Sequence, residues 1–227
     1  ALRYQAHIYH QGTTILAMSH WLNDFTHEHS DFACHYVGAG INTPTSPHPI
    51  TRQPHQLLFI GRDFIRKGGD LVVAAFQRVH QILPDAKLII AGPAIPPQAI
   101  AGVPGIEFVG AVDNRTVAEL MHRASVFVMP SRFEAFGIVF VEAMAAGMPI
   151  IGRDRFEMPY FVHEGSGLNI TSSPDPEAEI QDLTTKMHTL LTDATFQQRA
   201  TARAAHISQH YSWEAVAARA ATVFDRA

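Results

Sequence analysis

Short apolar runs that end in glycine or proline alternate, from residue 56 onward, with longer segments in which apolar residues recur every three or four positions. The first run, 57–60, is apolar at every position and is followed by Gly61, as expected for a strand that is buried on both faces of a sheet. Strands that alternate with helices form a parallel sheet through right-handed crossovers. The sequence therefore predicts an α/β fold with a Rossmann-like, doubly wound parallel sheet. Its predicted strands are 57–60, 87–91, 106–109, 125–129, 149–152 and 168–171.

Amphipathic helices are predicted between these strands. The first must end before Pro84, because proline cannot continue a helix. The second begins after Asp113, whose carboxylate can accept hydrogen bonds from the first amides, and Val117 is expected on its inward face. Beyond the last strand the chain is a helical tail, in which Ser212 caps a final helix with Trp213 facing inward. The helices predicted between strands are 69–83, 113–123 and 137–146, and the tail begins with an apolar stripe over 180–191.

The first 55 residues differ in composition from the rest. They hold five charged side chains and eight of the fourteen histidines, and they end in four closely spaced prolines. Such a proline-rich segment cannot sustain a helix or a central strand. We therefore predict a leader at 1–41, a linker at 42–55 and a domain at 56–227. His27 and His29 flank Glu28, but neighbouring residues point to different faces of a strand or helix, so they form a poor chelate and no metal site is predicted.

Composition excludes several classes of protein. Hydrophobic residues make up 47% and charged residues 17%, which rules out a disordered chain. The net charge of −4 gives no electrostatic footprint for nucleic acid. The single cysteine, Cys34, excludes an internal disulfide framework, and no apolar run reaches the roughly 18 residues that a membrane span needs. The chain of 227 residues is long for one domain, short for two, and begins at Ala1 without a signal-peptide pattern, so we expect a fragment.

Ligands of an open parallel sheet bind beyond the carboxyl ends of its strands. After the first strand, Gly61 allows a sharp turn, Arg62 can present a planar fork to phosphate oxygens, and Lys67 supplies a point charge. The glycine pair 68–69 lets the next helix begin close to a ligand with its free amides available. This loop is also consistent with solvated basic side chains that bind nothing.

Two glutamates follow the fourth strand. Glu134 precedes a helix and Glu142 lies within it, eight positions on, so they lie up to roughly 12 Å apart. That distance is about the span from a sugar, across a diphosphate, to a ribose. The helix N-terminus between them suits an anion, and carboxylates suit the flanking hydroxyls. An exposed Glu142, or one paired with a core arginine, remains an alternative explanation.

In order and spacing, these segments resemble the C-terminal domain of retaining glycosyltransferases of the GT-B fold, in the large family called group 1 or family four. The resemblance covers about residues 55–226, and it extends weakly to 15–22 and 37–42, which resemble the end of the family's first domain and the crossover. The motifs that carry it are Phe59-Ile60-Gly61-Arg62, Lys67-Gly68, Leu88-Ile89-Ile90-Ala91-Gly92, Phe108-Val109-Gly110, Pro130-Ser131, the Glu134-x7-Glu142 motif, Glu142-Ala143-Met144-Ala145-Ala146-Gly147-Met148-Pro149, Glu164-Gly165-Ser166-Gly167-Leu168 and Tyr211-Ser212-Trp213-Glu214.

The resemblance implies roles for these residues in binding a nucleotide-sugar donor, such as a UDP-, GDP- or ADP-sugar. Arg62 and Lys67 would bind the diphosphate, Glu134 would contact hydroxyls of the hexose, and Glu142 would hold the ribose hydroxyls. The implied catalytic residues are Glu134, Arg62 and Lys67. The other implied donor-binding residues are Gly61, Gly92, Val109 and Gly110, the last three near the base, Ile138 and Val139 beside the ribose and phosphate, and Phe136 and Gly137, whose amides would position the sugar.

The implied reaction is hexosyl transfer with retention and without a bound metal or cofactor. The implied partner is the missing N-terminal domain of the same protein, and without it the chain is expected to be inactive. The implied location is the cytoplasm, and any attachment to a membrane surface would be made by the missing half. A nucleotide-sugar-binding module without transfer activity and a sugar-nucleotide epimerase are the alternatives.

The chain departs from the family pattern after the fifth strand. Many members have a Gly-Gly pair there, whereas this chain has Arg153-Asp154-Arg155-Phe156-Glu157. We expect Arg153 or Arg155 to form a surface salt bridge with Asp154 or Glu157, and binding of an anionic acceptor is the alternative. Either way, this segment leaves the acceptor and the sugar unidentified.

Overall fold

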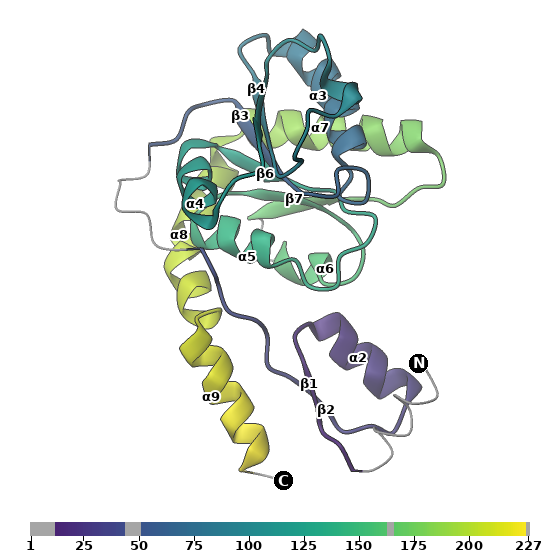
Figure 1. Cartoon of the computed structure of the whole chain (residues 1–227), viewed down its shortest axis with the longest axis vertical. Helices are drawn as coiled ribbons and strands as arrows, with labels where there is room; N and C mark the ends of the chain where they lie inside the picture. The colour runs from purple at the N-terminus through teal and green to yellow at the C-terminus, as the bar shows by residue number, and fades with distance from the viewer. Residues whose placement is uncertain (1–11, 44–50, 163–165, 226–227) are drawn as a thin grey trace. The chain divides into compact units, whose positions relative to one another are not determined.

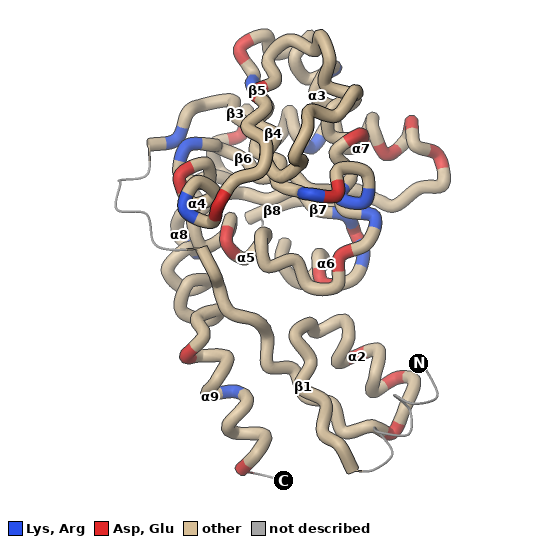
Figure 2. The backbone as a smooth tube through the Cα atoms, viewed as in Figure 1, with Lys and Arg blue, Asp and Glu red and all other residues tan. Residues whose placement is uncertain are grey.

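The computed structural model describes residues 12–43, 51–162 and 166–225. The chain divides into two compact units, Ala1–Ile41 with Ser208–Ala227, and Asn42–Ile207. The residues Ser208–Ala227 thus belong to the same unit as the leader, whereas the sequence predicts them as part of the domain 56–227. Figure 2 shows that charged residues are sparse along the described part of the leader and frequent in the second unit.

Among its described residues, the first unit contains a two-stranded parallel sheet and two helices that lie wholly within it. Its elements are β1 (Ile15–Ala17), α2 (His20–His29), β2 (Cys34–Tyr36) and α9 (Trp213–Phe224). Ser19 caps α2 and Ser212 caps α9, each through its hydroxyl. The prediction that Trp213 faces inward is wrong, since it is 52% exposed. Its ring lies against Gly40, where an added Cβ would come within 2.3 Å of it, and Val216 is the buried residue of α9 instead.

The second unit is the predicted α/β domain. Its six strands are all parallel, in the order β5-β4-β3-β6-β7-β8, which is the doubly wound order with the first strand of this unit, β3, at the centre. The strands are β3 (Gln56–Ile60), β4 (Lys87–Ala91), β5 (Ile106–Gly110), β6 (Val126–Val128), β7 (Ile150–Arg153) and β8 (Gly167–Ile170). The six predicted strands are therefore confirmed to within two residues at each end.

Helices cover both faces of this sheet (Figure 1). Helices α3 (Gly69–Ile82) and α7 (Pro176–Thr192) pack against each other on one face. On the other face, α4 (Asn114–Arg123) contacts β3, whereas α5 (Ile138–Ala145) and α6 (Met158–Phe161) contact β7. A 3-10 turn (Gln98–Ile100) precedes β5, and α8 (Ala194–His210) follows α7. Asp113 caps α4 as predicted, accepting from the Thr116 amide at 2.8 Å, and this hydrogen bond lowers the pKa of Asp113.

The core lies where the central strands meet the helices. The side chains of Leu57, Leu58 and Phe59 in β3 are fully buried, which explains why this strand has no polar face. The rings of Phe127 in β6 and Phe140 in α5 meet edge to face at 5.1 Å between centroids. These contacts fix α5 on the sheet, and α5 carries Glu142.

The predicted linker 42–55 lies partly outside the described residues, but Arg52 is firmly held. Its guanidinium donates to the carbonyls of Met121 at 3.0 Å, Ala124 at 2.6 Å and Ala146. It therefore donates to carbonyls at the C-terminal ends of both α4 and α5, where no amide of the same helix is left to donate. Burial lowers the pKa of Arg52 to about 10.

Arg153 is buried, so both expectations for it are wrong. Only 7% of its side chain is exposed, and it forms an ion pair with Glu179 of α7, including one hydrogen bond of 3.0 Å. Its Nε also donates to the carbonyl of Pro130 at 3.3 Å. Arg153 thus joins β7, α7 and the end of β6 instead of facing solvent. Glu157 is fully buried as well, whereas Arg155 is exposed.

We expect Arg52→Met to lower the free energy of unfolding by about 2–3 kcal/mol, because helix-end carbonyls lose a charged donor. For a domain of this size the melting temperature should fall by roughly 5–10 °C. Arg115→Met is the control, since Arg115 is 69% exposed and pairs with Glu119 at the surface. Equal melting temperatures for the two variants, measured by calorimetry, would contradict this assignment.

Glu179→Gln should destabilise the domain by about 3–5 kcal/mol, because it leaves the Arg153 charge buried and uncompensated. The double variant Arg153→Met/Glu179→Leu should recover most of that loss, since apolar residues of similar volume need no partner. Glu177→Gln on the same helix is the control, because Glu177 is exposed where it pairs with Arg78. Urea unfolding of the four proteins checks this, and a double variant no better than Glu179→Gln would refute it.

Candidate functional site

The sheet order places a crevice between β3 and β6. From β3 the chain proceeds to β4 and β5 on one side, and from β6 it proceeds to β7 and β8 on the other. Loops that leave the carboxyl ends of two such strands diverge, which opens a binding site between them. The loop after β3 carries Arg62 and Lys67, and the loop after β6 carries Glu134. The structure thus brings together segments about 70 residues apart in the sequence.

Two glycines allow the backbones at this crevice to approach each other. Gly68 has φ of +78° and caps α3, and a Cβ there would lie 2.5 Å from the carbonyl oxygen of Pro130. Gly92 has φ of +112°, and a Cβ there would lie 2.7 Å from the carbonyl carbon of Gly61. Any side chain at either position would force the loops apart.

The two amides of the glycine pair itself are bonded within the loop. The Gly68 amide donates to the Ile65 carbonyl at 3.0 Å, and the Gly69 amide donates to the Phe64 carbonyl at 2.8 Å. The loop 61–69 closes on itself through these turns. Its contribution to a site therefore comes from the side chains of Arg62 and Lys67.

Backbone and side-chain bonds hold the two loops together. The Arg132 amide donates to the Arg66 carbonyl at 2.9 Å, and Arg66 Nη1 donates to the Phe133 carbonyl at 3.0 Å. Arg132 also binds both carboxylate oxygens of Asp70 at 2.7 Å. This bidentate pair raises the pKa of Arg132 above its ordinary value.

Lys67 and Glu134 form an ion pair across the crevice. The exposed fractions of their side chains are 16% and 13%, so both are largely withdrawn from solvent. The residue predicted to bind a diphosphate and the residue predicted to bind a hexose are therefore in direct contact. This contact was not expected from the sequence.

A pocket of about 310 Å³ opens in the second unit, and neither Lys67 nor Glu134 is among its lining residues. Five of the predicted residues line it, and they come from the loops after β3 and β4 and from α5. The predicted lining residues are Arg62, Gly92, Ile138, Val139 and Glu142, and the others are Asn42, Ile60, Val112, Asn114 and Val117. Arg62 is exposed, and among the residues that the structure describes it has no polar partner, so its guanidinium is available to an anion.

Glu142 lies half-buried on the pocket-facing side of α5. Its Oε1 accepts from the Asn42 amide at 3.2 Å, which compensates one of the two carboxylate oxygens. Gly137 begins α5 with φ of +91°, and a Cβ there would lie 3.2 Å from Glu134 Cγ. The first amides of α5, which have no acceptor within the helix, therefore lie close to the Glu134 side chain.

The remaining predicted residues support the pocket without lining it. Gly61 and Gly110 are buried, and the Gly92 amide donates to the Gly110 carbonyl at 2.7 Å. Val109, the last residue but one of β5, is half-buried. The Phe136 ring is buried against Phe161, at 5.5 Å between centroids, so this residue can offer only its backbone.

Five lining residues were missed as site residues, among them Ile60 at the end of β3. Asn42 lies 100 positions from Glu142, and no local pattern indicates their contact. Val112 and Asn114 lie at the start of α4, beyond the carboxyl end of β5, a position that the strand rule could have indicated. Val117 was predicted to face the core, but it is half-buried and lines the pocket.

The segment 153–157, which stands where many family members have a Gly-Gly pair, lies close to the loop that follows β6. Phe156 has φ of +56°, a left-handed conformation that glycine adopts more easily. Its ring meets that of Phe133 edge to face at 5.2 Å. Residues 163–165, which include the start of the Glu164-Gly165-Ser166-Gly167-Leu168 motif, lie outside the described residues.

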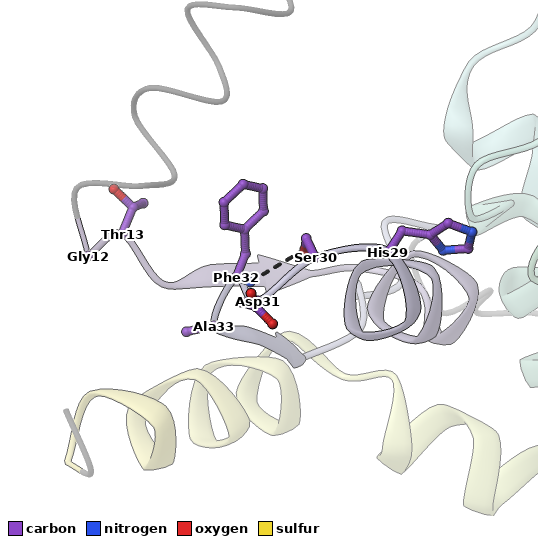
Figure 3. Close-up of a pocket in the computed structure, with 7 residues that line it drawn as sticks. All are labelled: Gly12, Thr13, His29, Ser30, Asp31, Phe32 and Ala33. Atoms are coloured by element: carbon purple, nitrogen blue, oxygen red, sulfur yellow. Dashed lines mark hydrogen bonds between the residues drawn. The ribbon is translucent and has the colours of Figure 1, made fainter.

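A second pocket, of about 580 Å³, lies in the first unit (Figure 3) and is lined by Gly12, Thr13 and the segment 29–33. It contains none of the predicted site residues. Within the described ranges, no group of three His, Cys, Asp or Glu side chains could hold a metal ion. A bilayer-spanning helix is absent from these ranges as well, since none of their helices combines the length and apolar character it needs.

Comparison with known proteins identifies the family. The family model for glycosyl transferases group 1 matches residues 54–193. The glycogen synthase of Mycobacterium tuberculosis (strain CDC 1551 / Oshkosh) is 29% identical over 196 residues, covering 82% of this chain and 46% of that protein. The phosphatidyl-myo-inositol mannosyltransferase of Mycobacterium leprae (strain TN) is 31% identical over 197 residues, covering 83% and 52%.

A solved structure shares the fold. HepE of Anabaena, in complex with UDP-glucose, matches with a TM-score of 0.75 at 20% identity, over 93% of this chain and 64% of that one. The chain spans about half the length of the curated relatives that it matches. The matched family model covers the strands and helices that form the pocket, and the chain therefore belongs to the glycosyl transferases of group 1, of which it holds the C-terminal, donor-binding domain of the GT-B fold.

Proposed function

We propose that this chain is the donor-binding part of a retaining hexosyltransferase that uses a nucleotide-diphospho-sugar. The observation that carries the proposal is the pocket at the β3–β6 crevice, where the available guanidinium of Arg62 and the carboxylate of Glu142 line one cavity. An arginine fork suits a diphosphate, and a carboxylate oxygen suits a pair of ribose hydroxyls. The UDP-glucose complex of the similarly folded HepE supports this class of ligand.

The roles follow from the positions of the side chains. Arg62 and Lys67 bind the diphosphate and stabilise the charge that develops on it as the bond to the hexose breaks, which is electrostatic catalysis that needs no bound metal. The first amides of α5 add a positive partial charge at the same place. Glu134 accepts hydrogen bonds from the hexose, and Glu142 accepts them from the ribose.

The base lies at the far end of the pocket in this proposal. Gly92 and the end of β5 supply main chain beside it, and Val112, Asn114 and Val117 form the wall contributed by α4. Apolar side chains with one amide group suit a planar base that is held mainly by its faces.

The acceptor site belongs to the other domain in this proposal. We assign residues 1–41 to the end of an acceptor-binding domain, of which the remaining part is the partner of this chain. The curated relatives are about twice as long as the matched region, which is consistent with that assignment. The enzyme is proposed to work in the cytoplasm, where nucleotide-sugars are made, with any membrane contact made by the partner domain.

A thermal-shift screen with UDP-, GDP- and ADP-sugars should reveal one nucleotide that raises the melting temperature, because a ligand of the folded state stabilises it. Calorimetry with that nucleotide should then show Lys67→Ala and Glu142→Ala binding at least about tenfold more weakly, since each loses a charge-assisted hydrogen bond. Lys87→Ala is the control, because Lys87 is exposed at the opposite end of its strand. Native affinity in both site variants would exclude this site.

The chain of 227 residues is expected to bind its donor but to transfer little or no sugar by itself, since a transferase cleft needs the acceptor wall. The measurement is release of labelled hexose from the identified donor, with and without a relative's first domain fused before the crossover. Transfer at a rate typical of enzymes by the chain alone would overturn the division of roles. Donor binding without transfer by the fused protein would favour a binding module.

A further inference from the structure

We propose that the Lys67–Glu134 ion pair makes this site prefer the intact nucleotide-sugar over the free nucleoside diphosphate that remains after transfer. The inference rests on the proposed function and concerns how the same site tells donor from product. Its basis is the direct contact of two side chains that were expected to hold different parts of the donor.

Among the residues that the structure describes, the Lys67 ammonium and the Glu134 carboxylate have only each other as polar side-chain partners. The first amides of α5, which lie close to Glu134, carry partial charges only. Their backbones are fixed, because the Lys67 amide donates to the Asp63 carbonyl at 2.9 Å and the neighbouring Phe133 carbonyl accepts from Arg66. In the unliganded site, each charge therefore depends on the other for compensation.

A diphosphate that binds Lys67 removes this compensation from Glu134. A largely buried carboxylate without a donor is costly, and one beside phosphate oxygens is also repelled by them. The hydroxyls of a hexose can donate to the carboxylate and replace the lysine. A nucleoside diphosphate brings only acceptor oxygens to the same place, so Glu134 opposes it.

The preference for the nucleotide-sugar over the free diphosphate therefore depends on the negative charge of Glu134. Replacing Glu134 by glutamine keeps the size and removes the charge, and the new amide can donate to phosphate. We expect Glu134→Gln to bind the free diphosphate about tenfold more tightly than the native chain does. It should bind the nucleotide-sugar no more tightly, because the hydroxyls lose a charged acceptor.

The experiment is calorimetry on the full chain with three probe pairs: UDP and UDP-glucose, GDP and GDP-mannose, ADP and ADP-glucose. The pair that binds the native chain is titrated into Glu134→Gln, Glu134→Ala and Glu142→Gln. Glu142→Gln is the matched control, because this glutamate lines the pocket of the proposed site but accepts from the Asn42 amide instead of pairing with a lysine. It should weaken both probes of the pair by a similar factor.

The inference is supported if the dissociation constant of the free diphosphate falls about tenfold or more while that of the nucleotide-sugar does not fall, in Glu134→Gln or Glu134→Ala but not in Glu142→Gln. The melting temperature of each variant shows whether it is folded. One folded Glu134 variant is enough to test the inference. Unchanged or weaker binding of the free diphosphate by a folded Glu134 variant would overturn the inference and leave the proposed function intact. Failure of the native chain to bind any of the six probes would instead overturn the proposed function.

Discussion

The close contact between the loops that follow β3 and β6 determines the rest of the site. Glycine at position 68 lets the start of α3 approach the Pro130 carbonyl, and the Arg132–Asp70 pair then fastens the second loop to that helix. Because both loops leave central strands, their separation is set by the sheet itself. The charged groups of the crevice are thereby placed by backbone geometry and not by their own flexible side chains.

A second layer supports this contact from behind. Arg153 of β7 reaches the Pro130 carbonyl while its charge is met by Glu179 of α7. Such a buried pair adds little stability compared with apolar packing. Its hydrogen bonds do, however, set the orientation of the Arg153 guanidinium between Glu179 and the Pro130 carbonyl. In this domain it connects a helix on one face of the sheet to the loop that carries Glu134.

Features with a local signal were predictable from the sequence. Continuous apolar runs identified the strands of the sheet, and Asp113, Ser212 and the terminal glycines and prolines identified helix ends to within one or two residues. The burial of Arg153 was not predictable. An arginine in a segment without a strand or helix pattern is expected to be exposed, and its partner Glu179 lies 26 positions away. The pairing of Lys67 with Glu134 depends on how two loops meet, and neither loop's sequence contains that information. The exposure of Trp213 was not predictable either. Its ring lies against Gly40, and the helical periodicity of the sequence gives no sign of that contact.

The hydrogen bond from Asn42 to Glu142 has a consequence for the cost of recognition. A free glutamate samples many rotamers, and a ligand that fixes one of them loses binding energy to the lost freedom. Here one carboxylate oxygen is already held by the backbone of a residue 100 positions away. The side chain is thus preorganised before a ligand arrives, and the chain segment that provides this restraint is the one where the two compact units divide.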